Sequence, residues 1–223
     1  MLTIKAFTFN AFQENTYVIY NENALAIIID PGCYEISEQQ VLLDFIQTNK
    51  LQVKRMLFTH AHIDHVLGAA FIEKTFGLKM EMHELELSVW RAIPSYASNY
   101  GFVYKAADEP DSFLSIDDQI QIGSDILTII FTPGHSPGSI SFYCEAQQFI
   151  IAGDVLFFKS IGRTDLAGGN YDTLIQSIKT NLFTPLIENS IDYDVFIHTN
   201  KIFGYYRNVW AKERTYNYIN EDI

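Results

Sequence analysis

Short apolar runs of strand length recur along the chain, separated by polar segments and by stretches with helical periodicity. Such runs, rich in Ile, Val and Phe, are typical of buried strands. They predict strands at residues 3–9, 16–20, 25–29, 53–58, 119–122, 126–131, 139–143, 148–152 and 195–197. Together with the helical stretches, they indicate a mixed α and β fold.

The helical pattern is clearest where capping residues support it. It predicts helices at residues 37–49, at 66–76, from 171 or 172 to 182, and from about 206. Ser37 and Gln40 form a capping-box pattern at the start of the first helix. Gly77 follows the second helix, as glycine commonly does at a helix C-terminus.

Residues 91–110 differ from their surroundings. They are rich in Ser, Tyr, Asn, Gly and Pro, and their apolar positions show little periodicity. We expect a long surface excursion here, which either borders a substrate cleft or is a plain loop.

The densest group of chemically active residues follows the apolar run that ends at Phe58. It reads Thr-His-Ala-His-Ile-Asp-His over residues 59–65, and it holds half of the six histidines in the chain. Neutral imidazole and carboxylate are preferred ligands of zinc and similar metals. A strand that delivers a metal-binding loop is therefore expected at this position.

Four other apolar runs also end in a histidine or an aspartate. These residues are Asp30, His135, Asp154 and His198. Strand ends of a layered α/β fold gather at one edge, where binding sites are commonly built. A lone residue of this kind is more often a turn former, but five such strand ends indicate one shared metal site.

Size and composition narrow the class of protein. We expect residues 1–223 to form one domain, because a chain of this length can bury a large core. The net charge of −12 disfavours a nucleic-acid partner, which requires clustered Lys and Arg. No apolar run approaches membrane-spanning length and no leader pattern opens the chain, so we expect a cytoplasmic protein. Cys33 and Cys144 do not make a disulfide framework.

The ordered set of these residues resembles the metallo-β-lactamase superfamily. The resemblance rests on an H-x-H-x-D-H loop, then a lone His, an Asp and a last His, and it spans residues 30 to about 208. Gly-Arg-Thr-Asp at 162–165 is similar to the short glyoxalase II-like hydrolases, also called hydroxyacylglutathione hydrolase-like enzymes, and to the related persulfide dioxygenases. The resemblance implies an α+β fold, an αββα sandwich of two mixed β-sheets flanked by helices.

The resemblance also implies a role for each matching residue. It implies two metal ions per chain. Zn²⁺ is the simplest choice, and Fe or Mn are alternatives to it. One ion would be held by His60, His62 and His135, and the other by Asp64, His65 and His198. Asp154 would bridge the two ions, and Asp30 would orient a ligand histidine through its other ring nitrogen.

The reaction implied is hydrolysis of a thioester or related acyl compound by a metal-bridging hydroxide. Asp64 would hold or accept the proton of this nucleophile. Arg163, Tyr205, Arg207 and Asn208 could hold an anionic tail of a small-molecule substrate, although Arg163 could instead pair with a nearby aspartate. Glutathione is not assured, because the chain ends soon after Asn208, where full-length glyoxalase II enzymes add a helical region. The sequence leaves the oligomeric state open.

Two other functions stay open. A persulfide dioxygenase would use one Fe(II) held by His60, His135 and Asp154, which is a two-histidine, one-carboxylate set. The second open function is that of a metal-binding protein without catalytic activity. The choice depends on His198, which lacks the glycines that flank the last His in the family. If His198 does not reach the site, the second metal would be held loosely.

Two residues near these motifs are given mainly local roles. His83 has no motif partner and is expected to be a helix cap or a surface residue. Cys33 follows Asp30 closely and is either near the metal edge or an inert loop thiol.

Overall fold

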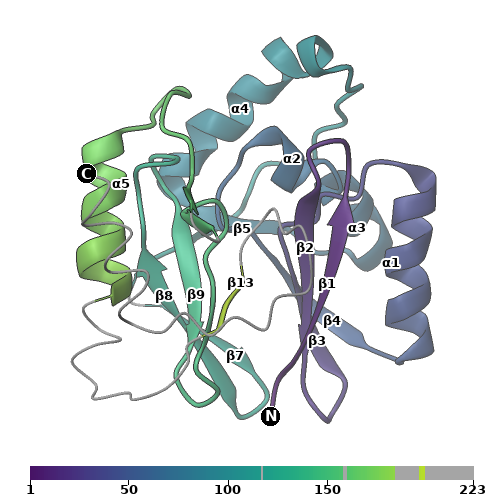
Figure 1. The fold of residues 1–223 in the computed structure, drawn as a ribbon. Helices are drawn as coiled ribbons and strands as arrows, with labels where there is room; N and C mark the ends of the chain where they lie inside the picture. Colours follow the sequence, from purple (N-terminus) through teal and green to yellow (C-terminus); the bar gives the residue numbers. More distant parts are fainter. Residues whose placement is uncertain (117, 158–159, 184–195, 199–223) are drawn as a thin grey trace.

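Two β-sheets pack face to face in the computed structural model, with helices on both outer faces (Figure 1). The structure describes residues 1–116, 118–157 and 160–183, together with the backbone of 196–198. Each sheet contains both parallel and antiparallel pairs. The α+β sandwich predicted from the sequence is therefore confirmed.

The first sheet has the strand order β1-β2-β3-β4-β5-β6. Its strands are β1 (Thr3–Phe9), β2 (Glu14–Tyr20), β3 (Leu25–Ile29), β4 (Gln52–Leu57), β5 (Met80–His83) and β6 (Phe113–Leu114). Strands β1 to β3 form an antiparallel meander, and β3 to β6 are parallel. Parallel neighbours need crossover connections, and helices supply them here.

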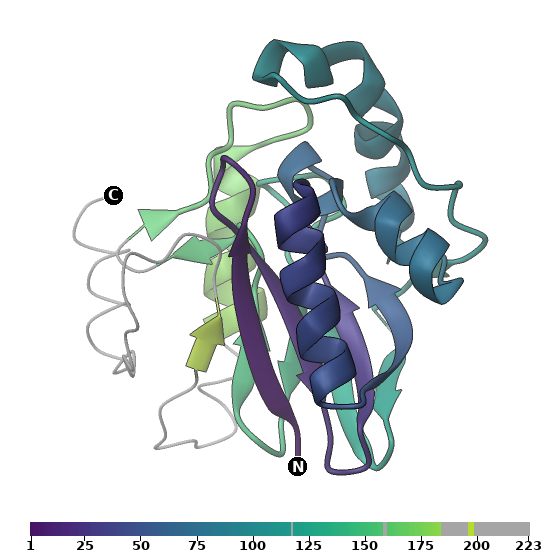
Figure 2. The same ribbon diagram turned by 90° about the vertical axis from the view of Figure 1, so that its right-hand side faces the viewer.

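The crossover helices lie outside the first sheet and above its strand ends. They are α1 (Ile36–Thr48), α2 (Ile63–Val66), α3 (Ala69–Phe76), η1 (Glu84–Glu86), α4 (Leu87–Tyr96) and η2 (Ala97–Tyr100). Helices α1 and α3 cover the outer face of the sheet, whereas α4 lies at the top of both views (Figures 1 and 2). None of the helices in the described part of the chain is long and apolar enough to cross a membrane.

The second sheet has the order β13-β10-β9-β8-β7. Its strands are β7 (Gln119–Ile122), β8 (Asp125–Phe131), β9 (Ile140–Cys144), β10 (Phe149–Ile151) and β13 (Phe196–His198). A small hairpin of β11 (Leu156–Phe157) and β12 (Ser160–Ile161) leads to α5 (Tyr171–Gln176) and the π-helical turn η3 (Ser177–Phe183). Leu174, Ile178 and Leu182 are buried on one face of this segment.

The core is layered like the sandwich itself. On β3, Ile27 and Ile29 face the second sheet, while Ile28 packs among the residues under the crossover helices. Alternate residues of a strand point to opposite faces, so a strand buried on both sides must be apolar throughout. This explains why β3 reads Leu-Ala-Ile-Ile-Ile.

The cap of α1 differs from the prediction. The helix begins at Ile36, and the capping box joins Glu35 and Glu38 rather than Ser37 and Gln40. Glu38 accepts backbone hydrogen bonds from Glu35 at 3.0 Å, Tyr34 at 2.8 Å and Asn10 at 2.6 Å. A carboxylate that satisfies three donors there outweighs the local Ser37 pattern.

The helix predicted at 66–76 begins later, as α3 at Ala69, and only Val66 of the predicted range belongs to the preceding short helix α2. Gly68 stands between the two helices, and its N–H donates to the carbonyl of Pro31 at 2.7 Å. A Cβ at this position would lie 2.6 Å from the Cys33 sulfur, so only glycine permits the close approach. Gly77 ends α3 with a left-handed φ of 69°, which confirms the predicted C-terminus.

The loop predicted at 91–110 is helical over its first part, so that prediction is wrong there. Helix α4 continues to Tyr96 and η2 to Tyr100. Trp90, Ile93 and Ala97 are buried along one face of this segment. Their tertiary packing outweighs the low helix propensity of the segment and the presence of a proline at 94.

Candidate metal centre

Three histidines from two loops bring ring nitrogens to one point. His60 and His62 follow β4, and His135 follows β8. His135 Nε2 lies 2.9 Å from His62 Nδ1 and 3.2 Å from His60 Nε2. All three side chains are buried, and their nitrogens could hold one metal ion.

A second group lies beside the first and shares His60 with it. This group is formed by His60, His65 and Asp154. Asp154 Oδ1 lies 3.5 Å from His65 Nε2, and Oδ2 of the same carboxylate lies 3.7 Å from His135 Nε2. Asp64 Oδ2 lies 3.8 Å from His65 Nε2. The carboxylate of Asp154 therefore faces both groups, one oxygen toward each.

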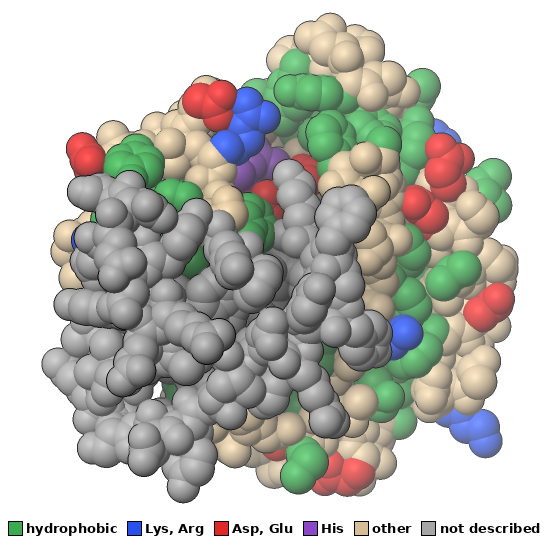
Figure 3. Space-filling view, in the orientation of Figure 1, with side chains coloured by type: hydrophobic (Ala, Val, Ile, Leu, Met, Phe, Trp, Pro, Cys, Tyr) green, Lys and Arg blue, Asp and Glu red, His purple; other side chains and the backbone are tan. Residues whose placement is uncertain are grey.

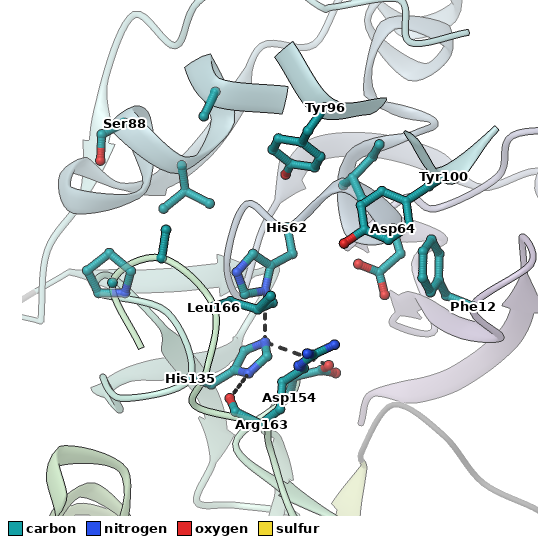
Figure 4. A pocket seen from close by; sticks show the side chains of 16 residues that line it. Phe12, His62, Asp64, Ser88, Tyr96, Tyr100, His135, Asp154, Arg163 and Leu166 are labelled. Atoms are coloured by element: carbon teal, nitrogen blue, oxygen red, sulfur yellow. Dashed lines mark hydrogen bonds and ion pairs between the residues drawn. The ribbon is translucent and has the colours of Figure 1, made fainter. Parts of the chain in front are cut away.

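Hydrogen bonding assigns the ring nitrogen that stays free in His135. Its Nδ1 lies 2.8 Å from the carbonyl oxygen of Arg163 (Figure 4). A carbonyl can only accept, so Nδ1 carries the proton and Nε2 keeps a lone pair. That lone pair faces His60, His62 and Asp154 and is available to a metal.

Asp30 orients two further histidines. It accepts hydrogen bonds from the Thr59 N–H at 2.7 Å and from the Thr59 hydroxyl at 2.6 Å. Because the hydroxyl proton is used in this way, Thr59 Oγ1 accepts from His60 Nδ1 at 3.0 Å. Asp30 Oδ2 also lies 3.1 Å from His65 Nδ1. Both histidines thus present Nε2 to the centre.

Burial keeps the first group uncharged. It lowers the pKa of His62 to about 3 and the pKa of His60 well below 6.5, and it also lowers the pKa of His135. Burial acts on the pKa of His65 in the same direction, but Asp64, Asp30 and Asp154 outweigh it and raise that pKa well above 6.5. Neutral imidazoles beside carboxylates are a donor set that fits a divalent metal.

Glu86 joins the two ligand loops, and the sequence analysis missed it. The side chain is completely buried. It accepts hydrogen bonds from Ala61 N at 2.7 Å, Ser136 Oγ at 2.6 Å and Gly138 N at 2.6 Å. Ala61 stands between two histidines of the first group, and Ser136 follows the third. Glu86 lies on the same helical face as the buried Trp90 and Ile93. An acidic residue on a face that is otherwise apolar is the sequence feature that could have identified it.

Asn10 joins the first ligand loop, at Asp64, to the loop that follows β3, at Gly32. Its amide group donates to the carbonyl oxygens of Gly32 and Asp64, each at 3.0 Å. Nothing in its sequence surroundings marks it, because both contacts are remote along the chain.

The Gly-Arg-Thr-Asp string lies directly against this centre. A Cβ on Gly162 would collide with the carbonyl oxygen of Asp154 and would lie 3.2 Å from His135 Nδ1. Only glycine lets the backbone pass here. Arg163 follows it and pairs in bidentate fashion with Asp165, with both hydrogen bonds at 2.7 Å.

The other residues singled out from the sequence have varied positions. The backbone of His198 lies in β13 beside Ile151, at the strand end that precedes Asp154. Tyr205, Arg207, Asn208 and the side chain of His198 lie outside the described residues. His83 caps η1 by accepting from Leu85 N at 3.3 Å, and Cys33 is buried.

A cavity of about 460 Å³ opens above the centre. His62, Asp64, His135 and Asp154 line its floor (Figure 4). The space-filling view shows histidine side chains at the bottom of a hollow on this face (Figure 3). A small molecule can therefore reach the ligand groups from outside.

Comparison with known proteins places this geometry in a family. A family model described as the metallo-beta-lactamase superfamily matches residues 9–189. This chain belongs to the metallo-beta-lactamase superfamily. Hydroxyacylglutathione hydrolase GloC of Haemophilus influenzae is 34% identical over 192 residues, which cover 85% of this chain and 88% of GloC. The probable metallo-hydrolase YqgX of Bacillus subtilis is also 34% identical, over 77% of this chain and 80% of YqgX.

Solved structures agree with this assignment. BLEG-1 B3 metallo-beta-lactamase has a TM-score of 0.78 and 29% identity, covering 90% of this chain and 92% of its own. TTHA1623 in a di-iron-bound form has a TM-score of 0.75 and 29% identity, covering 90% and 93%. The family resemblance inferred from the sequence is confirmed.

Proposed function

We propose that this protein is a dinuclear metal-dependent hydrolase that cleaves a thioester or related acyl compound. The observation that carries the proposal is the placement of Asp154 between two buried ligand groups. A carboxylate with one oxygen toward each group suits two adjacent ions better than one. The di-iron-bound form of TTHA1623, at 29% identity, supports a two-metal centre in this fold.

The chain supplies a distinct donor set to each ion. His60, His62 and His135 would hold the first, and His65 with Asp64 would hold the second, with His198 as a further proposed ligand. Asp154 would contact both. Zinc fits this mixture of imidazole and carboxylate, and Fe or Mn could replace it.

Bound metals of this kind polarise a carbonyl and lower the pKa of water to about 7. The protein residues do the rest of the work. Asp64 lies on the cavity floor, where its carboxylate can hold the nucleophilic water and accept its proton. Asp30 keeps the Nε2 lone pairs of His60 and His65 directed at the centre.

The choice of a thioester rests on two supports. GloC, at 34% identity, is named a hydroxyacylglutathione hydrolase. The Gly-Arg-Thr-Asp string that meets the centre is similar to that of short glyoxalase II-like hydrolases. We propose a small-molecule substrate handled in the cytoplasm, with Arg163 at the cavity wall and Tyr205, Arg207 and Asn208 as further binding residues.

A thioester panel tests the proposal directly. Metal-free protein would be reconstituted with Zn²⁺, Mn²⁺ or Fe²⁺, and thiol release would be followed with a chromogenic disulfide. We expect turnover that needs metal and is lost with a chelator. The Asp64→Asn variant should keep its first metal and its fold, yet lose hydrolysis by about two orders of magnitude or more.

This assay, together with the metal content and O₂ consumption, separates the alternatives. Unchanged turnover in Asp64→Asn would contradict the dinuclear mechanism. One Fe²⁺ per chain with O₂ consumption on a persulfide would replace it with the dioxygenase reaction. Bound metal without turnover across the panel would leave a metal-binding protein.

A further inference from the structure

Helix α4 has a stripe of apolar side chains that the protein core does not fully bury. Its buried face carries Trp90 and Ile93. A second stripe of Val89, Ala92 and Tyr96 recurs at helical spacing and lines the cavity instead. Val89 and Tyr96 are half-buried and Ala92 is exposed to the cavity. The sequence thus places apolar side chains where water or a ligand must cover them.

Other apolar side chains around the cavity continue this surface. Phe12 comes from the β1–β2 turn, Tyr100 from η2, and Leu166 from the loop after β12. Figure 4 shows Tyr96 and Tyr100 above His62 and Asp64, with Phe12 beside Asp64 and Leu166 next to His62. Phe12 and Tyr100 are in edge contact, with ring centroids 5.5 Å apart. The cavity therefore has an apolar wall and a polar floor.

Charge is scarce on that wall. Arg163 is the one Lys or Arg among the described residues that line the cavity. Asp165 already binds its guanidinium at two points, and both side chains are more than half exposed. A ligand carboxylate that approaches Arg163 would have to compete with Asp165 for its guanidinium.

We propose that the cavity selects substrates with an apolar, uncharged group next to the scissile bond, held against the α4 stripe. This inference rests on the proposed function, because the polar floor is where the bond would be cleaved. An apolar chain in this position would remove the stripe from water and gain the free energy of burial.

Two series of substrates test this on the full-length, metal-loaded protein. In the first, N-acetylcysteamine carries acyl chains from acetyl to octanoyl. In the second, acetyl thioesters carry alkyl thiols of the same range of lengths. The series tell whether the acyl or the thiol part lies against α4. We expect kcat/KM to rise by about two- to fourfold per methylene in one series until the cavity is filled.

A matched pair of variants ties the effect to the cavity. Ala92→Leu adds bulk to the stripe, and Ala106→Leu makes the same change at an exposed position that does not line the cavity. Ala92→Leu should shorten the preferred chain and lower kcat/KM for the longest substrate by about tenfold or more. Ala106→Leu should leave the chain-length profile unchanged.

Binding without turnover separates this inference from the proposed function. Dialkyl thioethers, which cannot be hydrolysed, would be titrated by calorimetry against wild type and both variants. Length-dependent binding with no hydrolysis of any thioester would support the apolar cavity and overturn the proposed function. A higher kcat/KM for a hydroxyacylglutathione than for every apolar thioester, with flat chain-length series, would overturn the inference and leave thioester hydrolysis standing.

Discussion

The four clustered histidines differ in the charge they carry before any metal binds. Burial lowers the pKa of His62 to about 3, whereas carboxylates outweigh burial at His65 and raise its pKa well above 6.5. His62 is therefore ready for a metal at neutral pH. His65 must first release a proton, so binding of the second metal is expected to strengthen as pH rises.

Imidazole ¹⁵N NMR of the metal-free protein checks this difference. His62 should stay neutral from pH 8 down to pH 4, and His65 should stay protonated at pH 7. In Asp30→Asn, the midpoint of His65 should fall because one of its carboxylate neighbours is lost. Midpoints near the ordinary value of about 6.5 for both rings would contradict the account.

The two shifts act on stability with opposite signs. The unfolded chain protonates His62 below about pH 6.5 while the folded chain does not, so this residue reduces stability as pH falls toward 3. His65 contributes stability below about pH 6.5, and that contribution is lost as pH rises through its raised folded pKa.

Glu86 is predicted to set metal affinity without contacting the metal. Glu86→Gln keeps the size of the side chain but turns an acceptor into a donor, which would face an N–H or O–H donor at Ala61 or at Ser136 and Gly138. We expect zinc affinity to fall by about 10- to 100-fold, as for other residues that orient ligands.

Competition with a chromophoric chelator measures that loss. Glu84→Gln, an exposed change in the same 3-10 turn, is the matched control and should bind zinc as wild type does. Equal zinc affinity in Glu86→Gln and wild type would show that the two loops hold their positions without this carboxylate.

At the scale of elements, two glycines are needed for different reasons. Gly77 is needed for its backbone conformation, and Gly162 is needed because other atoms lie close to it. Gly77 ends α3 with positive φ, and a Cβ there would meet nothing within 4 Å. Gly162→Ala, in contrast, would push the segment after β12 away from Asp154 and His135. Gly77→Ala should cost about 1 kcal/mol in urea unfolding and keep full metal content.

Gly162→Ala should lose metal and activity, because the segment that holds His135 through the Arg163 carbonyl has to move. Metal content by mass spectrometry and the thioester assay measure both losses. Wild-type metal content in Gly162→Ala would mean that the Gly-Arg-Thr-Asp string does not shape the centre.

Elements with strong local patterns were predictable, and those that depend on remote contacts were not. The buried run of β3 and the glycine after α3 are visible in the sequence. Helix α4 is not, because its Ser- and Pro-containing sequence becomes helical only when Trp90 and Ile93 pack into the core. The cap of α1 was not predicted, because Glu38 also accepts a hydrogen bond from the backbone N–H of Asn10, which is 28 residues away.

At the scale of the whole molecule, the sandwich gathers strand ends from both sheets at one edge. The loop at 59–65 follows strand β4 of the first sheet. His135 and Asp154 follow strands β8 and β10 of the second sheet. The candidate ligands within this loop could be predicted from their spacing in the sequence. The roles of His135, Asp154 and His198 came from the family resemblance. Glu86 and Asn10 could not be found in that way, because they act only through the packing of distant segments.

The parallel pairing of β10 and β13 bears on the second metal. It sets Ile151 beside His198, so the backbone of His198 stands at the same sheet edge as Asp154. We therefore predict that His198→Ala loses the second metal and keeps the first. His83→Ala, which changes a histidine at the cap of η1, should keep both.

Metal identity and stoichiometry test the central claim most directly. Plasma mass spectrometry on tag-free protein purified without chelators would count the ions per chain, in wild type and in the two histidine variants. The account predicts close to two metal ions in wild type and His83→Ala, and close to one in His198→Ala. A single iron per chain in wild type, unaffected by His198→Ala, would contradict the dinuclear hydrolase and favour the oxygen-dependent alternative.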